Sequence, residues 1–192
     1  MKNNIFPLEP NHFYHIYNRG INGDQLFFNH QNYLYFLRLI NEKVKPVAEI
    51  HSYCLLKNHF HILVKIKSED LIREKFAEKE SLEIQSIISQ QFSNTFNSYS
   101  QGINKHFGRT GKLFELPFRR KEITSDQQLI NTILYINKNP VKHKILNDLF
   151  TYHYSSINKI INDDNLFLES EEVISLFNDK DNFILALQNY SV

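Results

Sequence analysis

The sequence is poor in cysteine and glycine and has no long apolar run. Its 192 residues include one cysteine, Cys54, and five glycines. A single thiol excludes a disulfide framework and any metal site built from several thiolates. It also favours a reducing compartment, so we expect a cytoplasmic protein. No segment approaches the roughly 20 apolar residues of a membrane span, and the N-terminal segment lacks the apolar stretch of a secretory signal.

The composition is that of a folded domain. Hydrophobic residues make up 42% of the chain and aromatic residues 14%, which is enough for a packed core. The length fits one domain of ordinary size with an appendage. No internal repeat or linker rich in glycine and serine divides it. We expect a main domain over residues 1–156 and an acidic, helical extension over residues 157–192.

The net charge of +1 conceals two segments of opposite sign. Residues 102–144 hold nine basic and three acidic side chains, whereas residues 145–192 hold two basic and eight acidic ones. A strongly basic segment attracts polyanions, of which nucleic acid is the commonest. The alternative is a solvated basic face that the acidic tail neutralises within the same chain.

The order of predicted elements indicates an α+β fold. β-Prone runs predict strands over residues 12–19, 47–56, 59–66 and 118–124. Apolar periodicity predicts helices over residues 31–43 and 81–106, and a third from Ser125 to about Lys138, where Pro140 is expected to stop it. This is a ferredoxin-like split βαβ pattern, an antiparallel sheet with helices on one face and the other face open. Shorter helices are expected at 156–161, 171–177 and 182–189.

Two histidines share one face of the strand over residues 59–66. Alternation places Phe60, Ile62 and Val64 on one face and His59 and His61 on the other. Two imidazoles that are two residues apart on one sheet face are close enough to bind one cation. The alternative is a pair of half-buried histidines that are hydrogen-bonded to their neighbours.

A tyrosine lies on the polar side of the last predicted core helix. Tyr135 is not needed for packing there, which makes it a candidate functional residue. The alternative is an ordinary amphipathic residue at the rim of the buried helix face. Asn139 is one turn further along, so the two side chains converge. An amide oxygen and a hydroxyl are suitable ligands for a hard cation. Together with the histidines, they suggest a cation that holds a scissile phosphate while Tyr135 attacks it and becomes linked to the 5′ end.

Four segments resemble the single-tyrosine HUH transposases. The closest likeness is at residues 53–64 (YCLLKNHFHILV), the strand-turn-strand motif of that family, with residues 14–20 (YHIYNRG) similar to its opening strand. Residues 135–143 (YINKNPVKH) resemble its nucleophile helix. Residues 152–156 (YHYSS) are similar to a short motif of the branch associated with REP elements. These motifs occur in the family's order and span most of the chain.

The resemblance implies a function and a set of roles. Residues 1–156 would be the catalytic domain, with His59, His61 and Asn139 as ligands of Mg²⁺ or Mn²⁺ and Tyr135 as the nucleophile. The implied substrate is single-stranded DNA with hairpin ends, and the implied assembly is a monomer or a homodimer. The chain departs from the family at Asn137 and Lys138, where relatives are more apolar, and in its long acidic tail.

The basic segment supplies candidates for DNA binding. The phosphate-contact candidates are Arg119, Arg120, Lys121, Lys112, Lys138 and Lys142. Alternation places Arg119 and Lys121 on one face of their strand and Arg120 on the other. Phe13, Tyr17 and Tyr53 are candidates for stacking on unpaired bases.

Three functions are consistent with these features. The first is a metal-dependent DNA transposase that cleaves and rejoins single strands through Tyr135. The second is a catalytically silent or domesticated protein of the same fold that binds DNA hairpins. The third, a replication initiator or relaxase, is disfavoured, because such enzymes usually carry further domains for which 192 residues leave no room.

Overall fold

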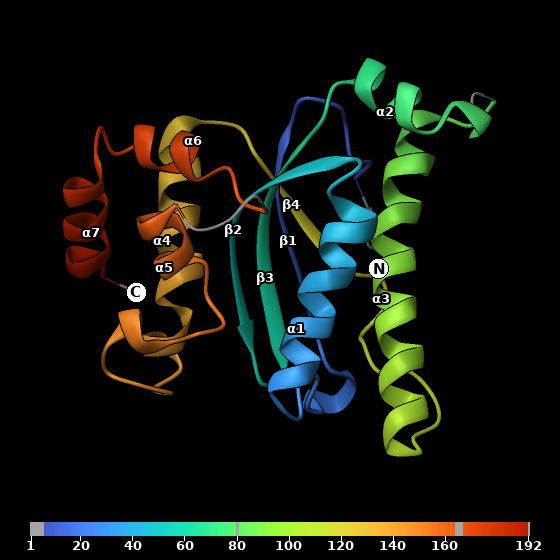
Figure 1. The fold of residues 1–192 in the computed structure, drawn as a ribbon, viewed down its shortest axis with the longest axis horizontal. Coiled ribbons are helices and arrows are strands. Elements are labelled where there is room, and N and C mark those ends of the chain that lie inside the picture. The colour runs from blue at the N-terminus through green and yellow to red at the C-terminus, as the bar shows by residue number, and fades with distance from the viewer. Residues whose placement is uncertain (1–5, 80, 164–166, 192) are drawn as a thin grey trace.

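A four-stranded antiparallel sheet stands between two groups of helices in this computed structural model, which describes residues 6–79, 81–163 and 167–191. Figure 1 shows α1 and α3 on one side of the sheet and α4 to α7 on the other. The first five residues of the expected main domain therefore lie outside the described residues. Within the described residues, no helix is both long and apolar enough to cross a membrane.

The expected sheet is confirmed, and its strand order is β2-β3-β1-β4. The strands are β1 (Phe13–Arg19), β2 (Ala48–Leu56), β3 (His59–Ile66) and β4 (Arg119–Ile123). Both β1 and β2 pair antiparallel with β3. They therefore run in the same direction with β3 between them, which is the split βαβ arrangement of a ferredoxin-like fold. This arrangement makes β1 and β3 the two central strands.

Two long helices cover the apolar face of the sheet. They are α1 (His30–Leu39), which continues as a π-turn over Ile40–Val44, and α3 (Ile84–Phe107). The ring of Phe60 packs 4.9 Å from that of Phe36 in α1 and 5.3 Å from that of Phe96 in α3. The expected core face of β3 is thus confirmed. The short helix α2 (Glu69–Lys75) is an addition that the sequence analysis did not predict.

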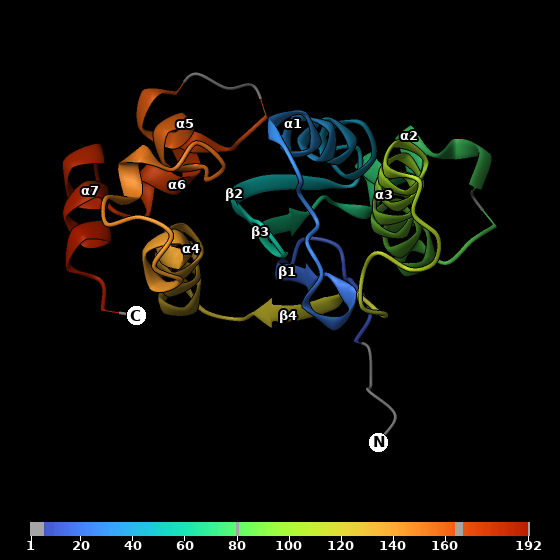
Figure 2. The same ribbon diagram turned by 90° about the horizontal axis from the view of Figure 1, so that it is seen from below.

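The opposite face of the sheet is partly covered by α4 (Asp126–Lys142), which crosses it beside β2 and β3 (Figure 2). This arrangement differs from the open face that we expected. The physical reason is that α4 is buried on two sides, since Ile136 and Asn139 are both inaccessible to solvent. On the polar side of α4, Asn139 is therefore buried, whereas Gln128 and Asn131 are exposed to solvent.

The expectation that Pro140 ends the last core helix is wrong, because α4 continues through it to Lys142. A proline inside a helix has no N–H to donate and leaves the carbonyl four residues earlier without its usual partner. That carbonyl belongs to Ile136, and the side-chain Nδ2 of Asn139 donates to it at 3.3 Å. The same Nδ2 donates to the carbonyl of Tyr135 at 2.9 Å. Asn139 thereby replaces the donor that Pro140 lacks.

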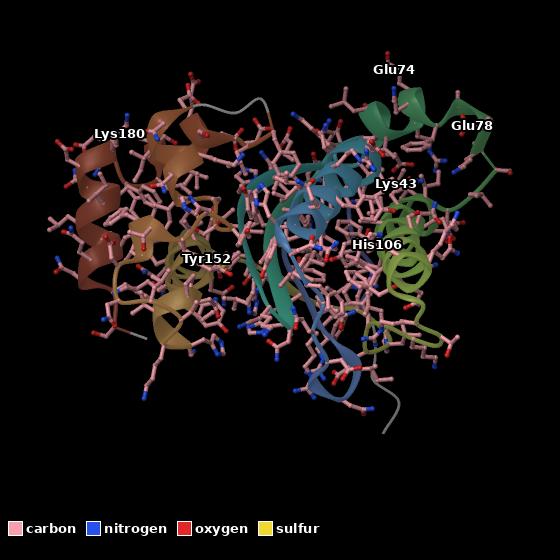
Figure 3. All side chains as sticks on the ribbon, turned by 60° about the horizontal axis from the view of Figure 1, so that its bottom comes forward. Lys43, Glu74, Glu78, His106, Tyr152 and Lys180 are labelled. Atoms are coloured by element: carbon pink, nitrogen blue, oxygen red, sulfur yellow. The ribbon has the colours of Figure 1, made fainter. Side chains whose placement is uncertain are left out.

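The predicted tail helices are present as α5 (Ile157–Asn162), α6 (Ser170–Ser175) and α7 (Lys180–Asn189). They lie beside α4, away from α1 and α3 (Figure 2). Residues 152–156 lead into them along the edge of β2. The Tyr152 hydroxyl donates to the carbonyl of Leu55 at 2.7 Å, and the N–H of Leu55 donates to the carbonyl of Tyr154 at 2.9 Å. Figure 3 shows Tyr152 among the side chains that fill this region.

A buried polar network joins α4, β2 and the segment over residues 152–156. Nδ2 of Asn137 donates to Oγ of Ser52 at 2.9 Å. Oγ of Ser156 donates to Oδ1 of Asn137 at 2.9 Å and accepts from the N–H of Tyr53 at 3.0 Å. All three polar side chains are buried and partnered. The network therefore accounts for Asn137, one of the two departures from the family pattern, and it fixes α4 on the sheet.

We expect Ser156→Ala to lower the free energy of unfolding by about 1–3 kcal/mol, because it leaves the side-chain oxygen of Asn137 and the backbone N–H of Tyr53 buried without a partner. Urea unfolding measures this change. Ser100→Ala is the matched control: the Ser100 hydroxyl donates only to the carbonyl of Phe96 in its own helix, so its loss should change stability by less than about 0.5 kcal/mol. Equal effects of the two substitutions would contradict the role given to the network.

Candidate active site

The two central strands bring polar side chains to one point on the face that α4 partly covers. In the antiparallel register, Tyr17 of β1 lies opposite His61 of β3, and Arg19 lies opposite His59. Directly opposed side chains in such a pair share one face of the sheet. The two histidines predicted as metal ligands therefore have neighbours from β1.

Four imidazoles follow one another across this site. The ring centroids of His15 and His61 are 5.0 Å apart, those of His61 and His59 are 5.3 Å apart, and those of His59 and His143 are 4.8 Å apart. Nε2 of His15 lies 2.9 Å from Nδ1 of His61, within hydrogen-bonding distance. Nδ1 of His59 lies 2.8 Å from Oδ1 of Asn58 in the hairpin turn. Both ligand candidates are thus oriented through their Nδ1 atoms.

The predicted nucleophile faces the predicted ligands. The ring of Tyr135 packs edge-on against His61, with the centroids 5.5 Å apart, and Nζ of Lys142 lies 4.7 Å from the centre of the Tyr135 ring. A cavity of about 370 Å³ opens here. Its lining residues are Tyr17, Asn18, Arg19, Asn58, His59, His61, Arg119, Tyr135 and His143. The structure therefore brings Tyr135, His59 and His61 into one cavity.

Burial keeps His59 and His61 neutral. It lowers the pKa of His61 to about 2, with further lowering by His15 and His59, and it lowers the pKa of His59 to about 4. A neutral imidazole has a free lone pair, which a metal ligand requires. Burial raises the pKa of the Tyr135 hydroxyl, and the nearby Asn139 side chain acts in the opposite direction. Tyr135 is therefore a protonated phenol near pH 7.

The donor set fits a divalent cation. Asn139 is completely buried, and its Oδ1 has no hydrogen-bond partner among the described residues. Its Nδ2 is directed to the backbone of α4, so the amide oxygen is the atom left free. An orphaned buried oxygen costs free energy unless something binds it. Asn139 is not among the residues that line the cavity, so the structure brings together the two imidazoles. The Asn139 oxygen is the candidate for a third ligand of Mg²⁺ or Mn²⁺.

A second group of metal-binding side chains lies at the other end of the sheet. Glu49, His51 and Glu172 are, within the part of the chain that the structure describes, the one set of three His, Cys, Asp or Glu residues with ligand atoms within 4.8 Å of each other. Nζ of Lys65 already lies 4.0 Å from both carboxylates. Lys65 is four residues from His61 along β3, or roughly 13 Å. This group connects β2 to α6 rather than contributing to the cavity.

Three of the basic candidates lie near the cavity. Arg119 lines it and forms an ion pair with Glu115 at 3.2 Å. Lys121 is on the same face of β4 and lies opposite His15 of β1. Lys142 covers the Tyr135 ring. The positions of Arg119 and Lys121 agree with the alternation expected for β4.

The other three basic candidates are directed elsewhere. Arg120 is on the opposite face of β4, where its guanidinium donates to Oγ of Ser89 in α3 at 3.3 Å. Lys112 lines a separate groove beside α3. Nζ of Lys138 donates to the backbone carbonyls of Gln188 and Tyr190 at the end of α7. The structure does not bring these side chains to the cavity.

Of the aromatic candidates, only Tyr17 lines the cavity. Tyr53 is 1% exposed and packs against Phe167, so the expectation that it stacks on a base is wrong. Phe13 lies against His51, with ring centroids 4.9 Å apart, at the other end of the sheet. A period-two pattern sorts strand residues by face but does not predict which end of a strand is open.

Three residues at the site were not identified from the sequence as site residues: His15, Arg19 and His143. The first two have the same parity as Tyr17 in β1, so alternation along that strand was the available signal. His143 is the C-cap residue of α4, eight residues beyond Tyr135. The mistaken end of this helix before Pro140 removed it from consideration.

We expect the metal-free protein to lose stability as the pH falls from 6.5 towards 4. The pKa of His61 is lower in the folded chain than its ordinary value of 6.5, so the unfolded chain takes up a proton that the folded site refuses. Between pH 7 and 4.5, the free energy of unfolding should fall by about 1–2 kcal/mol more for the wild type than for His61→Gln. Urea unfolding at several pH values measures this difference. If the free energy of unfolding changes equally with pH in the wild type and in His61→Gln, His61 does not have the lowered pKa described here.

We expect Asn139→Ala to reduce both the stability of the protein and its affinity for Mn²⁺. It should lower stability by about 1–2 kcal/mol, since the Ile136 carbonyl loses its donor, and it should weaken Mn²⁺ binding measured by calorimetry. Adding Pro140→Ala returns an N–H to that carbonyl. The double variant should regain the stability of the wild type but not its Mn²⁺ affinity. Recovery of both would show that the Asn139 oxygen is not a ligand.

The sequence matches no protein-family model and no curated protein. Among solved structures, the chain is similar to a REP-associated tyrosine transposase bound to a REP hairpin, with a TM-score of 0.63, 12% identity, and coverage of 84% of this chain and 86% of that one. It also aligns with a bacterial tRNA(His) guanylyltransferase-like protein in complex with ATP, with a TM-score of 0.45, 12% identity, and coverage of 92% and 75%. The fold of this chain is therefore similar to that of a REP-associated tyrosine transposase, as its sequence motifs predicted.

Proposed function

We propose that this protein is a DNA transposase that cleaves and rejoins single-stranded DNA with hairpin ends through Tyr135. The observation that carries the proposal is the edge-on contact between Tyr135 and His61 in a cavity that also contains His59. The similar structure is a tyrosine transposase that was solved with a DNA hairpin. The sequence motifs and the cavity support the same reaction independently of that comparison.

The cavity supplies the groups for an in-line displacement at phosphorus. The Tyr135 hydroxyl loses its proton and attacks the phosphate, a bond forms between the phenol oxygen and phosphorus, and the bond to the 3′ oxygen breaks. The leaving 3′ oxygen takes up a proton, and the 5′ phosphate remains on Tyr135. A phenolate is a good leaving group, so the reverse attack by a 3′ hydroxyl rejoins the strand.

Positive side chains near Tyr135 would stabilise the phenolate that forms as Tyr135 reacts, against the burial that raises its pKa, and would hold the phosphate. The Lys142 ammonium lies over the phenol ring, and a nearby positive charge stabilises a phenolate. Arg19 and Arg119 line the cavity and share Glu115, so they present positive charge where a phosphate would lie. His59, His61 and Asn139 would hold Mg²⁺ or Mn²⁺, which supplies charge stabilisation to the phosphoryl and leaving oxygens when bound.

The second candidate function is binding of DNA hairpins without catalysis. One observation favours it: among the described residues, no three ligand atoms of His, Cys, Asp or Glu gather at this cavity within 4.8 Å. The reaction then depends on Asn139 as the third protein ligand. The two candidates differ in whether Tyr135 becomes covalently attached to DNA.

We expect the purified protein to form an adduct with hairpin-bearing single-stranded DNA in Mg²⁺, and we expect Tyr135→Phe to abolish it. Denaturing electrophoresis with 5′ and 3′ labels detects the adduct and shows which end is attached. Tyr17→Phe is the matched control, because Tyr17 lines the same cavity and packs 5.9 Å from His61. It should retain the adduct, since its phenol is not the nucleophile. An adduct that persists in Tyr135→Phe would falsify the assignment.

The same assay separates the second candidate. A protein that only binds hairpins gives no adduct with any cognate hairpin, while its binding falls with rising salt because phosphate contacts release counterions. In that case His61→Ala and Tyr135→Phe leave binding unchanged. If the protein is the transposase, His61→Ala prevents adduct formation and still permits hairpin binding.

A further inference from the structure

We propose that His15 is a positioning residue that holds His61 with its Nε2 directed into the cavity, as cation binding by His61 requires. This inference rests on the proposed function, because it concerns the same cation site. It goes beyond that function by assigning a role to a residue of β1 that neither binds the cation nor reacts.

The contact between the two histidines is direct and buried. Nε2 of His15 lies 2.9 Å from Nδ1 of His61, and the two residues are 9% and 7% exposed. No water competes effectively for such a bond, so it restrains the ring more than an exposed hydrogen bond would. His15 also packs edge-on against Tyr135, with the ring centroids 6.0 Å apart. One side chain of β1 therefore supports both the ligand and the nucleophile.

The contact is compatible with the tautomer of His61 that cation binding through Nε2 requires. An imidazole binds a cation through a nitrogen lone pair, and in its neutral form the proton is on the other nitrogen. If Nε2 of His61 is the ligand atom, Nδ1 carries the proton and donates it in the bond to Nε2 of His15. Histidine ligands usually donate their second N–H to such an acceptor, which fixes the ring and raises its basicity. In this chain the acceptor is another imidazole.

His15 is placed to support the cation site but not to bind the ion. It is absent from the residues that line the cavity, whereas His59 and His61 are both present there. Its Nε2 is directed to His61 rather than to the opening.

The test uses the full chain and Mn²⁺ alone as the probe. His15→Phe keeps a ring but removes the acceptor, whereas His15→Gln places an amide oxygen near the position of Nε2. We expect His15→Phe to weaken Mn²⁺ binding by about 10–100-fold and His15→Gln by less than about threefold. Calorimetry measures the affinity. Tyr14→Phe is the control for a buried change in the same strand, since Tyr14 is 1% exposed on the other face, and it should bind Mn²⁺ as the wild type does.

A second measurement begins with the wild type, where no variant has to fold. Nitrogen-15 NMR of the labelled imidazoles in the metal-free wild type should find the His61 proton on Nδ1. In His15→Phe the proton should be distributed over both nitrogens, and in His15→Gln it should return to Nδ1. A wild-type proton on Nε2, or unchanged Mn²⁺ affinity in a folded His15→Phe, overturns the proposal.

The outcomes separate this proposal from the proposed function. If Mn²⁺ binds the wild type and His61→Ala equally, the cation site fails, whatever His15 does. If His61→Ala loses binding while His15→Phe retains it, the cation site stands and the role of His15 fails. If His61→Ala and His15→Phe both lose Mn²⁺ binding and His15→Gln retains it, the cation site and the role of His15 are both supported.

Discussion

The position of α4 on the sheet is the constraint on which the site depends. The Asn137 side chain is buried between Ser52 of β2 and Ser156. Polar groups buried this deeply tolerate no sliding, because a shift by one residue would leave several of them without partners. The helix is therefore fixed in rotation and along its axis. Tyr135, two residues before Asn137, is held against His61 as a result.

In the same helix, one asparagine side chain compensates for a proline and keeps its amide oxygen free. Pro140 removes a backbone donor inside a buried helix, and Asn139 supplies a replacement with its Nδ2. That use of Nδ2 turns Oδ1 away from the backbone and leaves it buried without a partner. Repair of the helix and a buried oxygen left free, which the proposed cation site would use, are thus two consequences of one side-chain orientation. This accounts physically for the adjacent asparagine and proline.

The basic side chains of residues 102–144 point to different parts of the molecule. Arg119 and Lys142 are next to Tyr135, whereas Arg120 contacts α3 and Lys138 holds the end of α7. The basic segment is therefore not one continuous surface. Part of it stabilises the fold, including the contact between α4 and the acidic C-terminal helices, and part of it lines the cavity.

The four strands, the α+β class and the two faces of β3 could be predicted from the amino-acid sequence, because alternation and helical periodicity are local properties. The sequence also singled out His59, His61 and Tyr135, which the structure brings into one cavity. The contact between His15 and His61 could not be predicted in this way, since the two are 46 positions apart and meet through the register of β1 and β3 in the folded chain. The position of α4 across the second face and its passage through Pro140 could not be predicted either, because the donor that permits this is a side chain and not part of the backbone pattern.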